Sequence, residues 1–302
     1  NFKQLSGILQ SNGLNLESGY VRVERIRGNA PFYTYAVIND QASSDGSFVA
    51  PVDENLMSGR NGLTLPVVVE TKTFTTELNL TNFSKTEKTL LLSYAPEGLE
   101  PPGSTADVVL ILQAQSQIII PNFVQWMRQV GVVSLLPLKD SNSGPLFVTV
   151  RGNDASGIFV GGRTSSVGGG GRYGVFYAAV PFGAATATET WIYALQQNVE
   201  NRSNLSLVNT GEINQDPSLF QIEVFDGKSG TVAATINNIS VGSKKLFQIS
   251  SILQVYAPQL TQGYLHIKKL KGANPFIAFS VINDGGQPGE RTGDGAFITS
   301  SP

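Results

Sequence analysis

Two stretches of this chain carry the same sequence pattern, and this internal repeat constrains the fold more than any other feature. Gln4–Asp40 and Gln248–Asp284 align without a gap, so that Pro31 and Pro275, for example, lie 244 positions apart. A third, divergent copy lies between them, because Phe123–Val130 repeats the apolar spacing of the pattern. Internal repeats indicate structural units that pack on their neighbours. The sequence therefore predicts an array.

Each copy predicts a short helix followed by two strands. In the last copy, four apolar residues have the i, i+3, i+4, i+7 spacing that places side chains on one face of a helix: Ile249, Ile252, Leu253 and Tyr256. Such a helix is too short to be stable unless it is docked. The strand that opens at Tyr264 alternates until Leu270, where one extra residue predicts a β-bulge. Gly272 ends that strand, and Pro275 begins the next one, where its missing N–H costs least.

Composition limits the classes of protein that fit. Charged residues make up 15% of the 302 residues, the net charge is −2, and no run of Lys or Arg occurs, so we expect no nucleic-acid partner. No segment approaches ~18 consecutive apolar residues, so we expect no membrane span. The chain has no cysteine, which excludes disulfides, thiolate metal sites and cysteine nucleophiles. Low charge together with 32 glycines favours β-sheets and turns over helices.

We therefore predict an all-β fold of tandem β-sandwich modules, each with one short helix, of which the first module is incomplete. Strands in the first module are expected at Tyr20–Arg27, at Phe32–Ile38 and around Ser47–Val52. Val132–Gly144 is expected to be an insertion in the second module. The predicted boundaries are a C-terminal half-module at 1–52, a linker at 53–64, a second module at 65–181, a linker at 182–190 and a third module at 191–302. Modules of this size, with several short strands, are typical of β-sandwiches.

The third module also resembles a known family. The resemblance is carried by Leu205–Asn209, Phe225-Asp226-Gly227, Ile249–Leu253, Gln262-Gly263-Tyr264, Asn274-Pro275-Phe276 and Val281–Asp284. These residues resemble the β-sandwich units that are repeated in tandem near the C-termini of long secreted or surface proteins of environmental bacteria. The resemblance covers 191–302 and 1–52 well and 65–181 weakly. It implies a bacterial, extracellular or cell-surface protein with a structural or adhesive role, and it transfers no catalytic residue.

No motif predicts catalysis or a cofactor, and we expect a protein that is not an enzyme. Residues 169–174 fit G-x-G-x-x-G, but the strand Val175–Val180 follows where a dinucleotide site needs a helix, so a hairpin or a flexible loop is the better interpretation. His266 is the one histidine of the chain, which excludes histidine pairs for zinc, and its place on an alternating strand predicts a solvated face.

Two weaker kinds of ligand site stay open. Four aspartates in glycine-rich loops are candidate Ca²⁺ ligands, with Asx-turns as the alternative: Asp40, Asp45, Asp284 and Asp294. Four aromatic residues are candidates for a sugar-binding platform, with core packing as the alternative: Tyr20, Trp126, Trp191 and Tyr264.

The incomplete first module leads to the functional hypothesis. Half a sandwich cannot cover its own apolar face, so we expect an interface at Leu5, Ile8, Leu9, Val21, Val23 and Phe32. Either upstream domains of the same chain or other copies of the protein supply the missing strands, in the second case by head-to-tail strand complementation into a homopolymer. We therefore expect a structural subunit of an extracellular filament or cell-surface stalk. The alternative is a carbohydrate- or surface-binding adhesin module with glycans as partners.

Overall fold

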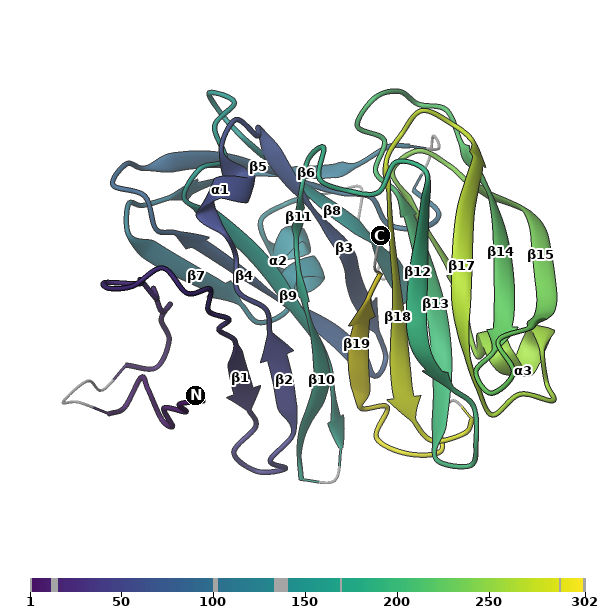
Figure 1. Ribbon diagram of the computed structural model, residues 1–302. Coiled ribbons are helices and arrows are strands. Elements are labelled where there is room, and N and C mark those ends of the chain that lie inside the picture. The colour runs from purple at the N-terminus through teal and green to yellow at the C-terminus, as the bar shows by residue number, and fades with distance from the viewer. Residues whose placement is uncertain are drawn as a thin grey trace.

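The structure is a computed structural model that describes residues 2–11, 16–99, 103–132, 141–168, 170–287 and 289–300. Its elements form antiparallel sheets with three short helices among the described residues, so the predicted all-β, sandwich-like class is confirmed. Two sandwiches lie next to one another, with the N-terminal residues at the outer side of the first of them (Figure 1). Within the described part of the chain, none of the helices has the length and apolar character needed to cross a bilayer.

The second predicted module is a two-layered sandwich. Its elements are β3 (Gly62–Thr71), β4 (Phe74–Asn82), β5 (Lys88–Tyr94), β6 (Ala106–Leu112), β7 (Ser116–Ile120), α2 (Phe123–Gln129), β8 (Ser141–Val150), β9 (Ile158–Gly168), β10 (Gly171–Ala178) and β11 (Val180–Pro181). One layer has the order β3-β8-β5-β6 and the other the order β7-β4-β9-β10, and the pair Glu70–Thr75 joins them at one edge. The predicted insertion Val132–Gly144 falls mostly on 133–140, outside the described residues, and its end belongs to β8.

The third module has the same strand order. Its elements are β12 (Glu189–Gln196), β13 (Asn201–Asn209), β14 (Ser218–Asp226), β15 (Val232–Val241), β16 (Lys245–Ile249), α3 (Ile252–Tyr256), β17 (Gln262–Lys271), β18 (Phe276–Asp284) and β19 (Gly295–Thr299). The layers β12-β17-β14-β15 and β16-β13-β18-β19 match, strand for strand, those of the second sandwich. A register shift beside Leu270 confirms the predicted bulge, and Gly272, at φ +103, follows the last residue of β17 as expected.

The N-terminal repeat forms only part of its predicted strands. It contains β1 (Ala36–Asn39) and β2 (Gly46–Val49), which are followed by α1 (Glu54–Met57). The pair Ile38–Ser47 corresponds to the pair Ile282–Ala296 of β18 and β19, so the repeat extends to the strand register. The predictions of a strand at Tyr20–Arg27 and of a strand from Phe32 were wrong for this chain, because no described strand lies before Ala36. A strand needs a neighbour to satisfy its backbone groups, and the first repeat lacks one here.

The two sandwiches pack directly against each other, and apolar residues of both belong to one buried cluster. Alternate residues of β18 point into different clusters, because Phe276 belongs to the core of the third sandwich and Phe279 to that of the second. Tyr177 packs edge-on against Phe279 and Phe297, with ring centroids 5.7 and 5.0 Å apart. The first half of β18 is therefore buried on both faces of its sheet, as its unbroken apolar start at Phe276–Phe279 reflects.

Both predicted linkers are shorter than expected. Met57, in α1, is buried in the core, and Gly62–Thr64 already belong to β3, so the linker 53–64 ends before the strand. In the linker 182–190, Thr186 forms a β-bridge with Phe276, and its last two residues belong to β12. Packing of the two sandwiches against each other explains both differences, since it draws the connecting residues into contact.

Candidate functional site

The N-terminal repeat exposes the apolar residues that its C-terminal copy buries. Phe276 is 0% exposed in the third sandwich, whereas Phe32, at the same repeat position, is 55% exposed. Val21 and Val23 are 54% and 53% exposed, although their counterparts on β17 are fully buried. Large exposed apolar side chains are candidates for an interaction surface when they lie close together. We call Val21, Val23 and Phe32, with the residues between them, the uncovered face.

The six predicted interface residues differ in their exposure. Leu5, Val21, Val23 and Phe32 are exposed, whereas Ile8 and Leu9 are half-buried. The predicted helix around them is not formed, and the N–H groups of Gln10 and Ser11 donate instead to the carbonyl of Gly7 in a turn. A helix this short needs a surface to dock on, as α3 docks on β13 in the third sandwich.

The hairpin of the first repeat is held firmly on the second sandwich. The Ser47 hydroxyl donates to the Gly174 carbonyl at 3.0 Å, and Arg163 Nε donates to the same hydroxyl at 2.8 Å. The Gly174 N–H donates to Asp45 Oδ2 at 3.0 Å, and the Arg163 guanidinium lies 3.5 Å from that oxygen. The strand β2 thus lies beside β10, and β10 lies beside β19, so equivalent strands of the three copies are neighbours (Figure 1). The residues of the uncovered face therefore precede a hairpin that hydrogen bonds attach to the second sandwich.

The four candidate calcium ligands separate into two groups. Asp40 accepts from the Ser43 N–H at 2.8 Å and from the Ala42 N–H at 3.1 Å, which is the Asx-turn that was the alternative, and these bonds lower its pKa. Asp45 and Asp294, which are equivalent residues of the first and last repeats, come together. Burial and the charge of Asp45 raise the pKa of Asp294 to about 6.

Asp284 also contributes to this group, but the arrangement is not that of a cation site. The Thr292 hydroxyl donates to Asp284 Oδ2 at 2.7 Å, and the Arg163 guanidinium already faces Asp45. Among the described residues, no three acidic or histidine side chains are grouped as metal ligands would be. The acidic pair is therefore a feature of the junction between repeats.

The four aromatic candidates occupy different environments. Trp126 stacks on Phe123 of α2 and packs against the core of the second sandwich, which was the expected alternative. Tyr20 is exposed outside any strand. Trp191 and Tyr264 instead lie together on the outer face of the third sandwich, with ring centroids 6.1 Å apart.

Sequence reasoning missed two members of this aromatic group. Tyr193 and Phe225 complete it, and the i, i+2 spacing of Trp191 and Tyr193 on one strand was the signal that could have found Tyr193. The prediction of a solvated His266 was wrong, because the Trp191 ring covers it at a centroid distance of 3.9 Å and leaves it 8% exposed. The glycine-rich loop, of which residue 169 lies outside the described residues, joins β9 and β10 as the hairpin that was expected.

Comparison with known proteins adds no assignment. No protein-family model matches the chain, and a search of curated proteins finds no match either. The resemblance to tandem modules of secreted bacterial proteins therefore stays a prediction.

Proposed function

We propose that the protein is a structural segment of an extracellular filament or cell-surface stalk, in which successive β-sandwiches are joined through the uncovered face. The observation that carries this proposal is the contrast between Phe32 and Phe276, which hold equivalent positions and have opposite exposure. The repeat has kept the apolar residues of a buried surface, including Val21 and Val23. Burial of such side chains stabilises an interface by roughly 1.5–3 kcal/mol each.

The strands of the two complete sandwiches specify the missing partner. In the third sandwich, the residues equivalent to the uncovered face pack on strands supplied by β12–β16, which form the first half of that module. We therefore expect a partner segment with the strand pattern of β12–β16. It would pair its strands with the N-terminal repeat by main-chain hydrogen bonds and cover its apolar side chains.

A count of half-modules refines the head-to-tail hypothesis. The described residues contain two first halves, β3–β7 and β12–β16, and three second halves, of which the N-terminal repeat is one. Exchange of strands among identical copies would therefore leave one second half uncovered in every chain. Among the described residues, no first half is left over for the N-terminal repeat, so its completing strands would be supplied in addition to β3–β7 and β12–β16.

A fusion protein tests this proposal directly. Residues 186–247 placed ahead of Gln4 would supply a first half in the register of the repeat, because Gln4 corresponds to Gln248. We expect amide hydrogen exchange over residues 18–35 to be fast in the original chain and to become slow in the fusion. The same fusion with Phe32→Asp is the matched control, and it should lose the protection because a buried carboxylate without a partner is costly.

Three results test the separate parts of the proposal. If residues 18–35 exchange equally fast in the fusion, the N-terminal repeat is not half of a sandwich. If the original chain forms filaments in which these residues are protected, a structural filament is supported, and identical copies supply the completing strands, contrary to the count of half-modules. Antibody labelling of intact and permeabilised source cells tests the location, and labelling only after permeabilisation would contradict an extracellular stalk.

A further inference from the structure

We propose that the outer face of β12, β17 and β14 in the third sandwich binds a neutral oligosaccharide. This inference does not depend on the assembly proposed above, because the face belongs to a complete sandwich. Four aromatic rings form the platform, Trp191, Tyr193, Phe225 and Tyr264, and a hollow lies at one end of it.

The alternation of three neighbouring strands places these rings together. Tyr264 on β17 is directly opposite Phe225 on β14, and their rings stack at 4.9 Å with an interplanar angle of 9°. On β12, the rings of Trp191 and Tyr193 are nearly parallel, with an interplanar angle of 4° and centroids 6.3 Å apart. Tyr193 is 49% exposed, and the other three rings are half-buried.

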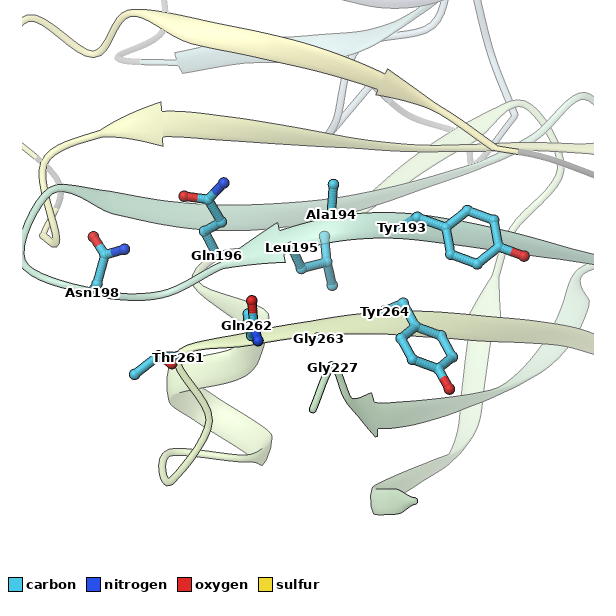
Figure 2. Close-up of a pocket in the computed structure, with 10 residues that line it drawn as sticks. All are labelled: Tyr193, Ala194, Leu195, Gln196, Asn198, Gly227, Thr261, Gln262, Gly263 and Tyr264. Carbon is cyan, nitrogen blue, oxygen red and sulfur yellow. The ribbon is translucent and has the colours of Figure 1, made fainter. Parts of the chain in front are cut away.

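The platform continues into a hollow with a polar lining. A cavity of about 570 Å³ is bordered by Tyr193 and Tyr264 at one end. Figure 2 shows these two rings beside each other, with the amide side chains of Gln196, Asn198 and Gln262 beyond them. Amide groups offer both donors and acceptors, which suits the hydroxyl groups of a sugar.

The charges around the site favour an uncharged ligand. None of the ten residues that line the hollow is charged at neutral pH. Next to the platform, Glu223 is paired with Lys268 at 3.0 Å, and His266 lies 3.1 Å from Glu189, so the neighbouring carboxylates have cationic or donor partners. A nucleic acid would need a basic groove, which this face lacks. A sugar ring presents slightly positive C–H groups, which fit the negative face of an aromatic ring.

The aromatic rings are a special feature of the third sandwich and are not required by the repeated fold. The position of Trp191 corresponds to Thr64 of the second sandwich, and that of His266 corresponds to Phe147. Thr64 and Phe147 are buried there, and Lys244 of the third sandwich lies over the Phe147 ring at 5.8 Å. The equivalent face is thus covered in the second sandwich and open in the third.

His266 and its carboxylate neighbours hold the platform in place. Its ring stacks on Trp191 at 3.9 Å with an interplanar angle of 4°, while Nδ1 lies 3.4 Å from Glu223. A ring fixed in this way loses little freedom when a ligand binds, which favours affinity.

Binding to neutral polysaccharides tests the proposal. The full chain is incubated with insoluble cellulose, chitin, xylan and mannan, and soluble oligosaccharides of each retained class are titrated while Trp191 fluorescence is followed in a Trp126→Phe background. We expect at least one neutral class to bind and to shift the Trp191 emission. Tyr193→Ala should weaken binding at least tenfold without changing the circular dichroism spectrum. Tyr256→Ala removes another exposed tyrosine of the same sandwich, on α3, and should bind like the parent.

Three outcomes would overturn the proposal: no neutral class is retained above an albumin control, only acidic polysaccharides are retained, or Tyr193→Ala binds as tightly as Tyr256→Ala. A Phe32→Asp variant separates this site from the assembly surface, because it should bind the same glycan with unchanged affinity.

Discussion

The same substitution at two equivalent positions tests whether the first and last copies of the repeat differ in the burial of their apolar residues. Phe276→Ala removes a ring that is 0% exposed and packs edge-on against Phe220 at a centroid distance of 4.9 Å. Truncation of a buried phenylalanine costs about 3–5 kcal/mol, because the lost apolar burial adds to the cost of the cavity. Phe32→Ala removes a ring that is 55% exposed, and surface substitutions usually change the free energy of unfolding by no more than about 0.5 kcal/mol.

The two tryptophans provide the assay, because each lies in a different sandwich. In a Trp126→Phe background, Trp191 alone reports the urea unfolding of the third sandwich, which contains it. We expect Phe276→Ala to lower the transition midpoint strongly and Phe32→Ala to leave it unchanged. If Phe276→Ala does not fold, Phe276→Leu keeps most of the buried volume and should fall between the parent and the alanine variant.

Hydrogen exchange completes the comparison, because the fluorescence of Trp191 does not report the N-terminal repeat. Peptides that cover residues 18–35 should exchange quickly in both the parent and Phe32→Ala, whereas peptides of β17 and β18 should exchange slowly in the parent. Slow exchange at 18–35 in the parent monomer, lost in Phe32→Ala, would refute the reasoning, since it would mean that the chain covers this surface by itself.

Two further substitutions have effects whose sign follows from the structure. Burial and the charge of Asp45 raise the pKa of Asp294 from 3.8 to about 6, so the contribution of Asp294 to stability is fully present below pH 3.8, is lost between pH 3.8 and 6, and stays absent above that range. Asp294→Asn should therefore raise the thermal midpoint at pH 7.5 and leave it unchanged near pH 3.5. An equal gain at both pH values would contradict the destabilisation of the Asp294 carboxylate by burial and by the charge of Asp45. Gly272→Ala should lower the midpoint of the third sandwich, because φ is +103 and the new Cβ would lie 2.6 Å from Ser218 Oγ. Gly28→Ala, at the same repeat position with φ +71 and open space around it, should leave that midpoint unchanged.

Local features of the third sandwich could be predicted from sequence because they depend on few neighbours. The bulge beside Leu270, the end of β17 before Gly272 and the start of β18 after Pro275 each follow from backbone preferences of one or two residues. The hairpin between β9 and β10 follows in the same way from its glycines.

Contacts between repeats could not be predicted, because no local pattern encodes them. The burial of Phe279 against Tyr177 depends on how two sandwiches are placed, and so does the meeting of Asp45 with Asp294. The burial of His266 under the Trp191 ring was missed for a related reason, because it depends on the pairing of β12 with β17. Strands in the first repeat were predicted from residues suited to a strand, but the structure shows that suitability is insufficient without pairing partners.

The positions of the two proposed surfaces make them compatible with one another. The N-terminal repeat lies at one side of the molecule, and β14, β17 and α3 lie at the opposite side (Figure 1). The face with the aromatic platform is formed by a sandwich whose strands are all paired, so that completion of the N-terminal repeat requires no change in it. A ligand on the platform and strands on the uncovered face can therefore be bound at the same time. In a stalk of joined sandwiches, this arrangement would leave the aromatic platform free at the side away from the joint.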